Sequence, residues 1–425
     1  MKTLIKNGNI VYFDKIERAD LLIDGEVISA IGQNIKETAD EVIDATDKCV
    51  FAGFVDMHVH LREPGFESKE TIETGARAAV RGGFTAVACM PNTNPVLDNK
   101  FVLRYVQDKA KEAGLAKVYP ICSITKGENG ELLSDMLSLY KSGAVAFSDD
   151  GKPVRTSQMM RLALEYSKAY DLPVLCHCED MDLTNGGCVN EGYNATVYGL
   201  KGINRASEEV AVAREIIIAA NLGAKLHICH VSTAGSVEII RAAKKLGVKV
   251  TAETCPHYIS LTDDCVAGFN TMAKVNPPLR EAKDVEAVRA ALADGTIDCL
   301  ATDHAPHAHW DKECQFDTAA FGISGLETAF AVNYTYLVKT GVLNLPKLSA
   351  LMTKNPCSVL KLPDKGIAVG EKADLTVVDL NKAWTVNPSK FASKGKNTPF
   401  AGKELFGAVE MTFVDGDKKY ARDGE

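Results

Sequence analysis

Eight short apolar runs, separated by stretches of helical periodicity, constrain the fold of this chain more than any other feature. Each run is rich in Val, Ile, Ala, Phe or Cys, as expected for strands buried on both faces. Strands that alternate with helices favour a parallel sheet. The runs cover residues 50–61, 85–91, 117–124, 144–149, 173–178, 226–231, 249–254 and 298–302.

Apolar residues at helical spacing fill the intervals between these runs. We expect helices over residues 67–81, 207–220, 236–246 and 284–293, and a further one over 325–340 after the eighth run. Eight βα units over about 300 residues predict an α/β fold with a closed (β/α)8 barrel, here residues 50–365. A doubly wound open sheet is the alternative, but no Gly-rich phosphate loop follows the first run.

Both ends of the chain differ from the middle. Residues 1–49 and 366–425 contain short β-like segments with turns and little helical periodicity. We expect these two parts to pair into a small β-sandwich domain made from both termini.

Composition excludes several classes of function. The net charge is −8 and no basic stripe is visible, so a nucleic-acid-binding protein is not expected. No apolar run approaches the roughly 18 residues of a membrane span, and no signal peptide is recognisable. The twelve cysteines include no CxxC pair. We expect a cytoplasmic protein with buried free thiols.

The histidines indicate chemistry. His58 and His60 end the first run, and side chains two apart on a strand share a face. They would project together at the C-terminal mouth of the barrel, where active sites of this fold lie. Four more ligand-type residues end or follow other runs, and these are Asp150, His177, His230 and Asp303.

Four imidazoles and two carboxylates are a donor set that can hold one or two divalent ions. Asp303 can also take a proton from the attacking water and pass it to a leaving nitrogen. Together these features predict metal-assisted hydrolysis of an amide-like bond. His227, three residues before His230, is expected to point away from this inward face, and Asp56 is expected to be structural.

Polar residues at the same rim indicate an anionic substrate. Arg62 lies two residues beyond His60, and a guanidinium can grip a carboxylate in bidentate fashion. Asn92, Asn276 and His307 follow the second, seventh and eighth runs. We expect them to line a pocket for a small anionic molecule.

Six motifs resemble those of the longer bacterial type of dihydroorotase, in the amidohydrolase superfamily. They are GFVDMHVHLREPG at 53–65, CMPNTNP at 89–95, FSDDG at 147–151, ATDHAPH at 301–307, FGISGLET at 321–328 and KGKNTPF at 394–400. The resemblance extends over essentially the whole chain.

The resemblance implies zinc ligands at His58, His60, Asp150, His177, His230 and Asp303. It implies substrate contacts at His60, Arg62, Asn92, Asn276, His307 and the backbone of Phe321 and Gly322. The implied reaction is the reversible interconversion of dihydroorotate and N-carbamoyl-L-aspartate in pyrimidine synthesis, with one or two Zn²⁺ per subunit. The family also implies the β-sandwich from both termini, and a homodimer is expected.

Two other readings stay open. Hydantoinases and allantoinases resemble this barrel but carry a carboxylated lysine at the end of the fourth strand, where this chain has Asp149 and Asp150. Spacing alone does not decide which aspartate is the ligand; the family register favours Asp150. Some dihydroorotase-like chains are non-catalytic partners of aspartate transcarbamoylase, but they have lost ligands that this chain retains. An active enzyme can still associate with that partner.

The segment 306–321 has few apolar anchors. We expect it to form a mobile loop over the site that substrate orders.

Overall fold

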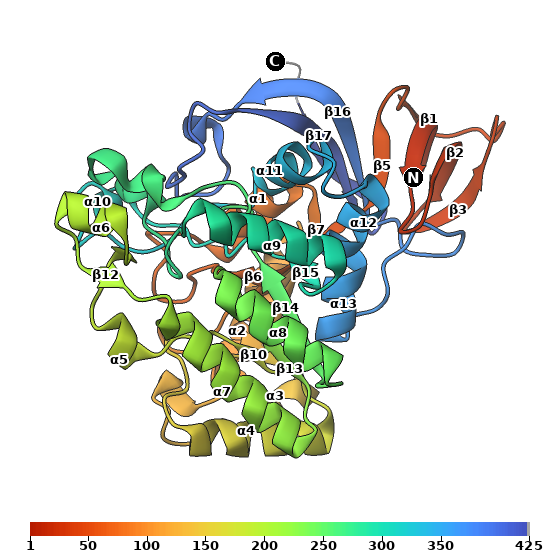
Figure 1. The fold of residues 1–425 in the computed structure, drawn as a ribbon. Coiled ribbons are helices and arrows are strands. Elements are labelled where there is room, and N and C mark those ends of the chain that lie inside the picture. The colour runs from red at the N-terminus through yellow and green to blue at the C-terminus, as the bar shows by residue number, and fades with distance from the viewer. Residues whose placement is uncertain (423–425) are drawn as a thin grey trace.

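Eight parallel strands form the centre of the molecule (Figure 1). The computed structural model describes residues 1–422. The strands form two four-stranded sheets, β6-β7-β8-β9 and β10-β13-β14-β15. Parallel bridges between Phe147 and Val174 and between Val59 and His304 join the two sheets at both seams, so the barrel closes. The strands are β6 Phe54–Val59, β7 Phe84–Cys89, β8 Lys117–Cys122, β9 Ala146–Phe147, β10 Leu175–Cys176, β13 Leu226–Ile228, β14 Val250–Thr254 and β15 Cys299–Leu300.

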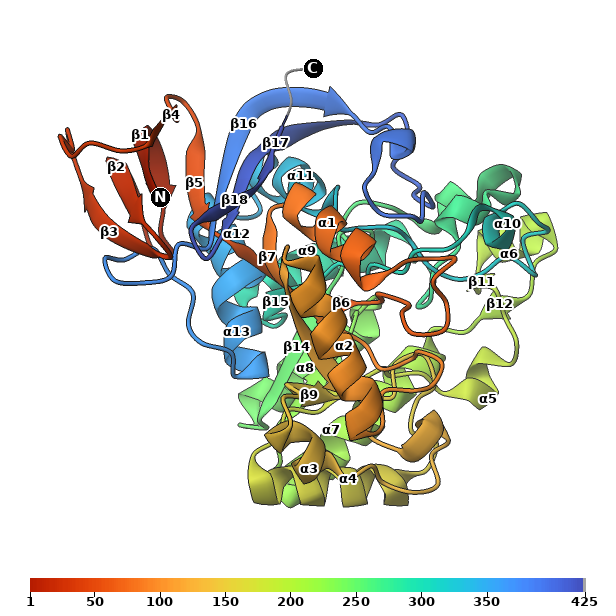
Figure 2. The same cartoon turned by 180° about the vertical axis from the view of Figure 1, so that it is seen from behind.

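Helices surround this barrel (Figures 1 and 2). They are α1 Ile72–Arg81, α2 Lys100–Ala113, α3 Met136–Lys141, α4 Ser157–Tyr170, α7 Ala206–Leu222, α8 Ala234–Lys245, α9 Ala282–Asp294, α11 Ala329–Asn333, α12 Leu345–Ser349 and α13 Asn355–Leu360. Threonine caps start several of them: Thr71 begins α1 and Thr233 begins α8, each accepting from a backbone N–H of the first turn. The helix expected over 325–340 begins only at Ala329 and continues as a π-helical turn, Tyr334–Val338.

Short elements are inserted after β10 and β15, at the carboxyl ends of the strands. They are α5 Met181–Thr184, β11 Val189–Asn190, α6 Tyr193–Tyr198, β12 Gly202–Ile203 and α10 His309–Lys312. Figures 1 and 2 show them gathered on the side of the molecule opposite β1–β3. Short 3₁₀ turns lie at Lys126–Glu128, Asp263–Phe269, Thr271–Ala273 and Pro388–Lys390.

Strands from both termini form one eight-stranded sheet. Its order is β18-β17-β16-β5-β1-β2-β3, and β4 pairs with the first half of β1, on the same edge that β5 uses further along. The strands are β1 Lys2–Val11, β2 Ile16–Asp24, β3 Val27–Gly32, β4 Glu41–Asp44, β5 Cys49–Ala52, β16 Leu375–Thr385, β17 Glu404–Val414 and β18 Asp417–Ala421. The central pairing of β5 with β16 joins the start of the chain to its end.

The expectation of a single strand over residues 50–61 is wrong. β5 belongs to the terminal sheet and β6 to the barrel, and Gly53 separates them. A Cβ at position 53 would lie 2.2 Å from Thr85 Cγ2, so only glycine fits where the chain passes from one sheet to the other. An apolar run gives no local sign of this division, because both strands are buried.

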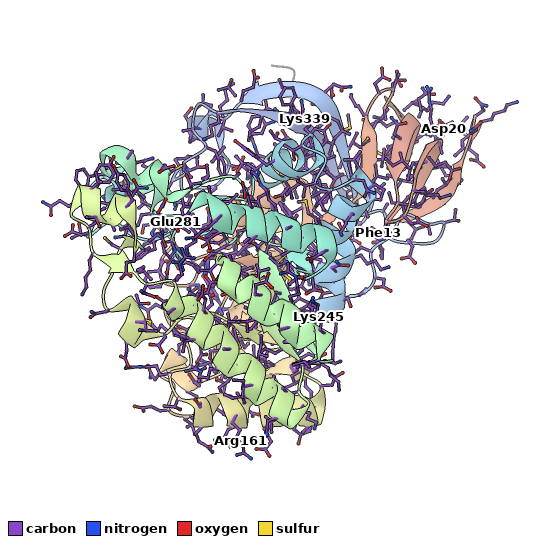
Figure 3. All side chains as sticks on the ribbon, in the orientation of Figure 1. Phe13, Asp20, Arg161, Lys245, Glu281 and Lys339 are labelled. Atoms are coloured by element: carbon purple, nitrogen blue, oxygen red, sulfur yellow. The ribbon has the colours of Figure 1, made fainter. Side chains whose placement is uncertain are left out.

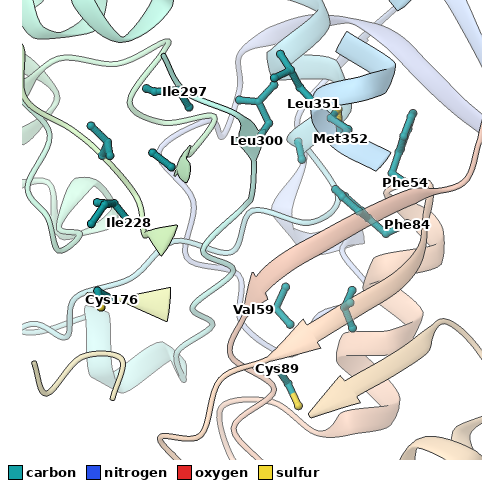
Figure 4. Close-up of a cluster of buried hydrophobic side chains, with 14 of the residues drawn as sticks. Phe54, Val59, Phe84, Cys89, Cys176, Ile228, Ile297, Leu300, Leu351 and Met352 are labelled. Atoms are coloured by element: carbon teal, nitrogen blue, oxygen red, sulfur yellow. The ribbon is translucent and has the colours of Figure 1, made fainter. Parts of the chain in front are cut away.

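Aromatic packing holds the terminal sheet on the barrel. Phe54 of β6 stacks on Phe330 of α11 at a ring distance of 5.2 Å, and Phe51 of β5 meets the same ring at 5.5 Å. Figure 4 shows Phe54 beside Phe84, among further buried apolar side chains. Rings at these separations add stability beyond the area they bury. Charged side chains such as Arg161 and Lys245 lie on the outer helices (Figure 3).

All twelve cysteines are unpaired, and ten of them are buried. Within residues 1–422, no helix is both long and apolar enough to cross a membrane.

Candidate active site

Two histidines leave the end of β6 with one ring nitrogen fixed and the other directed at a common centre. His58 Nδ1 lies 2.6 Å from Glu253 Oε1, and His60 Nδ1 lies 2.9 Å from Asn92 Oδ1. The Nε2 atoms of both rings approach the same carboxylate, that of Asp150. Fixing Nδ1 orients each ring for ligation through Nε2.

Asp150 lies at the middle of the cluster. Its Oδ1 is 3.5 Å from His58 Nε2, 3.3 Å from His177 Nδ1 and 3.4 Å from His230 Nε2. Its Oδ2 is 3.4 Å from His60 Nε2. One oxygen of the carboxylate therefore faces three imidazoles and the other oxygen faces the fourth, so Asp150 lies close to all four histidines.

Asp303 completes the cluster after β15. Its Oδ1 lies 3.0 Å from His60 Nε2 and 3.5 Å from His58 Nε2. Asp303 and His230 both have positive φ, 47° and 36°. Non-glycine residues rarely adopt this conformation, and such strain gathers where a side chain must be held in one direction.

Unpartnered polar atoms show that the cluster suits a metal ion. Among the described residues, His58 Nε2 and Asp150 Oδ1 are buried without a hydrogen-bond partner. Buried polar groups left unpaired cost free energy, so they normally have partners. Nε2 and carboxylate oxygens this close, in groups such as His58, His60 and Asp303, are the donors that Zn²⁺ takes.

Two buried glutamates behind the ligand-type histidines were missed by sequence reasoning. Glu253 of β14 contacts His58, and Glu179 Oε2 lies 2.8 Å from His177 Nε2. Glu253 is fully buried, so the signal available in the sequence was a glutamate within an apolar strand run. A buried carboxylate needs a charged or hydrogen-bonding partner.

The expectation for His227 is wrong. Its Nε2 lies 3.3 Å from Glu253 Oε2, so it faces the same inner network as His58. The prediction carried strand alternation from His230 back to His227. However, β13 ends at Ile228 and His230 has left-handed backbone, so alternation does not extend across them.

A pocket of about 190 Å³ opens above the cluster. Most residues expected at the site line it, namely His60, Arg62, Asn92, Asp150, His177, His230, Asn276, Asp303, Phe321 and Gly322. His58 is fully buried and lies outside the lining. The small volume and polar lining favour a small polar molecule.

Polar side chains of the pocket are held from behind. Asn276 Nδ2 donates to Glu179 Oε2 at 2.9 Å, which links the pocket wall to His177. Arg62 has a positive φ of 64°, so it is placed by a turn and not by strand alternation. Its Nε donates to Pro306 O at 3.2 Å. Burial lowers the pKa of Arg62 to about 10, which leaves the guanidinium charged at neutral pH.

His307 lies beside the pocket, outside its lining. Its Nε2 is 2.7 Å from Phe321 O and 3.3 Å from Arg62 Nη2. Burial, together with the positive charges of Arg62, Lys69 and Lys312, lowers the pKa of His307 to about 2, so the ring is neutral. The N–H of Gly322 donates to Lys274 O at 2.9 Å. A substrate contact through that N–H would have to replace this bond.

The two neighbouring aspartates have different surroundings. Asp149 turns away from the histidines and accepts from the N–H groups of Ile124 and Thr125 at 2.8 and 3.0 Å. Only Asp150 faces the cluster. Asp56 accepts from the N–H groups of His58 and Thr302, both at 3.1 Å, and so ties β6 to the end of β15.

Electrostatics keep Asp303 ionised. Burial raises the pKa of its carboxyl, but hydrogen bonding to His60 and the charges of His58 and His230 outweigh burial and lower it. A carboxylate that is ionised at neutral pH can accept a proton.

Comparisons with known proteins agree on the family. Residues 47–236 match the family model described as dihydro-orotase-like. Among curated proteins, the chain is 51% identical to the dihydroorotase of Thermoanaerobacter sp. (strain X514), over 100% of this chain and 98% of that protein. It is 52% identical to the dihydroorotase of Acetivibrio thermocellus, over 97% of this chain and 98% of that protein.

A solved structure shares the fold of this chain over its whole length. The L-hydantoinase (dihydropyrimidinase) from Arthrobacter aurescens superposes with a TM-score of 0.88 at 26% identity, over 100% of this chain and 96% of that one. That likeness is at 26% identity, whereas the near-full-length identity of about half the residues is with dihydroorotases. By its barrel, its cluster of histidines and aspartates, and this identity, the chain belongs to the dihydroorotase family of the amidohydrolase superfamily.

Proposed function

We propose that this chain is a dihydroorotase, which hydrolyses the cyclic amide of dihydroorotate to N-carbamoyl-L-aspartate and catalyses the reverse ring closure in pyrimidine synthesis. One observation carries the proposal. The pocket joins a shared-carboxylate cluster of four histidines to the charged guanidinium of Arg62. The cluster suits hydrolysis of an amide, and Arg62 suits a substrate that bears a carboxylate.

We assign the metal-ligand role to His58, His60, Asp150, His177, His230 and Asp303. Asp150, which faces all four histidines, would hold the metal together with them and with Asp303. Zn²⁺ at these positions, one or two ions per subunit, would polarise the ring carbonyl and make a water molecule more acidic. The remaining chemistry belongs to the side chains.

Asp303 is the proton-transfer residue in this proposal. Its carboxylate takes a proton from the water that adds to the ring carbonyl carbon. It then gives that proton to the ring nitrogen as the carbon–nitrogen bond breaks, so the nitrogen leaves neutral. Ring closure follows the same steps in reverse. The position of Asp303, 3.0 Å from His60 and in the pocket wall, supports this role.

Arg62, Asn92 and Asn276 would hold the substrate. The guanidinium binds the carboxylate of dihydroorotate. Asn92 uses its carbonyl oxygen on His60, which leaves its amide N–H groups for the same carboxylate. His307 and the backbone of Phe321 and Gly322 would close the pocket around the ring.

The alternative substrates are hydantoin and allantoin. The fold alone does not exclude them, because a hydantoinase superposes closely. Two residues favour dihydroorotate. Asp150 faces the histidine cluster at the place where the family resemblance puts a carboxylated lysine in hydantoinases, and Arg62 lines the pocket with a charge that an uncharged ring does not need.

Further expectations about organisation belong to this proposal. We propose that the terminal sheet acts as a separate β-sandwich-type domain beside the barrel, and that the enzyme is a homodimer. An association of the active enzyme with aspartate transcarbamoylase is also proposed. We further propose that the segment 306–321 moves over the pocket and is ordered by substrate.

A matched pair of variants tests the function and the metal role together. The purified protein, Asp150→Asn and Asp149→Asn are assayed with dihydroorotate, hydantoin and allantoin, and metal content is measured on the same samples. We expect activity confined to dihydroorotate, loss of metal and activity in Asp150→Asn, and both retained in Asp149→Asn. Preference for hydantoin or allantoin would overturn the substrate. Full metal and activity in Asp150→Asn would overturn the assignment of that carboxylate.

A further inference from the structure

A second pocket lies where the terminal sheet meets the barrel helices, and no role in the proposed reaction uses it. Its volume is about 370 Å³. The end of α1 contributes Arg81, the end of β16 contributes Lys382 and Trp384, and Tyr420 and Arg422 come from the end of the described chain. Figure 2 shows α1 beside the strands β17 and β18, against which it packs.

The walls combine aromatic rings with cations. The guanidinium of Arg422 lies 5.6 Å from the centre of the Trp384 ring, and that of Arg81 lies 5.7 Å from the centre of the Tyr420 ring. Trp384 Nε1 is buried and has no hydrogen-bond partner among the described residues. An unused buried donor is unfavourable, so it marks a position where an acceptor would be stabilised.

Cationic side chains line this pocket. Among the described residues, the ion pairs of Arg81, Lys382 and Arg422 involve two carboxylates, Glu327 and Glu410. Arg81 lies 2.9 Å from Glu327, and Lys382 and Arg422 share Glu410 at 3.1 and 3.7 Å. Their side chains keep 38%, 34% and 18% of their surface exposed, so a ligand can reach them.

We propose that this pocket binds a small anion that carries a planar ring, such as a nucleoside monophosphate. The ring would stack against the aromatic wall of Trp384 and Tyr420, and Arg81, Lys382 and Arg422 would bind the phosphate. A volume of about 370 Å³ falls within the range of small-ligand sites. This binding site is additional to the proposed function and does not depend on it.

A continuous set of contacts leads from this pocket to the active site. Glu327, the partner of Arg81, accepts from the N–H groups of Ala392 and Ser393 at 3.0 and 3.1 Å. Ser393 Oγ donates to Glu70, whose Oε2 lies 3.3 Å from His304 Nε2. A phosphate that draws Arg81 away from Glu327 would therefore change the contacts of Ser393 and Glu70, and through them the position of His304, which follows Asp303 in the chain.

The same segment also supports the rim of the active-site pocket. Asn397, four residues after Ser393, accepts from the N–H of His307 at 2.9 Å and donates to Gly322 O at 2.9 Å. We therefore expect the ligand to change the KM for dihydroorotate. This part of the inference rests on the proposed function.

Binding is tested without any assay of turnover. The chain has two tryptophans, so the variant Trp310→Phe leaves Trp384 as the single fluorescent indole. AMP and UMP are titrated against this variant, and calorimetry measures the stoichiometry on the unmodified protein. We expect saturable quenching with one site per chain. Inorganic phosphate and ribose 5-phosphate should bind at least about tenfold more weakly, because base stacking is lost.

Two further variants locate the site. Lys382→Gln should weaken binding about fivefold, the effect of one partly exposed charge. Lys419→Gln, on β18 but outside the pocket lining, should leave binding unchanged. Arg62→Ala should also retain binding, which separates this pocket from the active site.

Three results would overturn the inference: no binding of either nucleotide at millimolar concentration, equal binding of phosphate alone, or equal loss in Lys382→Gln and Lys419→Gln. A nucleotide that binds as expected but leaves the KM unchanged would overturn only the coupling. Absence of dihydroorotase activity would overturn the proposed function and leave the binding result standing.

Discussion

Replacing Glu253 by glutamine should weaken metal binding although Glu253 itself is not a proposed ligand. Glu253 Oε1 lies 2.6 Å from His58 Nδ1, and both side chains are fully buried. The carboxylate orients the ring and increases the basicity of its other nitrogen, Nε2, which faces Asp150 and Asp303. Glutamine keeps the shape and one acceptor but removes the negative charge.

The magnitude follows from what a carboxylate behind a histidine ligand contributes. Loss of such a partner costs about 10- to 100-fold in metal affinity, or about 1.4 to 2.7 kcal/mol. We expect the upper part of this range, since water cannot replace the lost charge at a position with no exposed surface. His227 contacts the other oxygen of Glu253 at 3.3 Å and can change tautomer to accept from the new amide.

Competition with a chromophoric chelator measures the zinc affinity of the wild type and of Glu253→Gln. Dihydroorotate turnover is followed at limiting and at excess zinc. Excess zinc should restore most of kcat, and KM should stay near the wild-type value because Glu253 does not line the pocket.

Glu128→Gln is the matched control. Glu128 is also buried, and burial raises the pKa of its carboxyl to about 8, so glutamine replaces a group that is already largely neutral. Its zinc affinity should be that of the wild type. Zinc affinity within twofold of wild type in Glu253→Gln, with a folded protein, would refute the argument that this carboxylate tunes His58.

Three further predictions concern the substrate, the loop and stability. Arg62→Ala should lower kcat/KM for dihydroorotate by about 100-fold, the loss of a bidentate charged contact, and lower use of an uncharged cyclic imide far less; equal losses on both would exclude the carboxylate role. Lys312 is buried and donates to the carbonyls of Thr271, Lys274 and Ala320 at 3.1, 3.0 and 2.6 Å. Lys312→Met should therefore speed hydrogen exchange over residues 306–321 and raise KM. Exchange in this segment of the wild type that is as slow as in the barrel strands, with and without ligand, would contradict a mobile loop. Burial raises the pKa of Glu208, but the charge of Arg280 and hydrogen bonds from Ser232 outweigh burial and lower it below 4.5; this stabilisation is present above the unfolded pKa and is lost as pH falls through the folded pKa. Glu208→Gln should therefore reduce the free energy of unfolding by about 3 kcal/mol at neutral pH. Urea titrations in which this difference does not shrink as pH falls below the unfolded pKa would contradict the ionised pair.

Local sequence determined the strands and the approximate position of each site residue. Runs such as 85–91 and 117–124 form β7 and β8, because a continuous apolar segment buries all its side chains only as a strand covered on both faces. The polar residues that follow those runs reach one rim, because parallel strands all end there. The pocket therefore brings together Arg62, Asn92 and Asn276 from distant parts of the sequence, as expected.

Tertiary structure decided which way the side chains point at the site. Strand alternation predicts the face of a side chain only while the strand continues. The left-handed conformations at Arg62, His230 and Asp303 interrupt it, which is why the expectation for His227 was wrong. Neither spacing nor composition separates Asp149 from Asp150.

Long-range pairing decided the rest. The run 50–61 divides at Gly53 because β5 pairs with β16, more than 300 residues later, and a residue cannot indicate locally which distant strand it will meet. The same holds for Glu253. In the sequence it is a charged residue within an apolar strand, and only the folded structure shows that His58 is its partner. The sequence by itself determined which chemical groups are present and at which rim they lie, since burial and periodicity are local properties. Tertiary structure alone decided which groups touch, because each of these contacts joins two residues that are far apart in the chain.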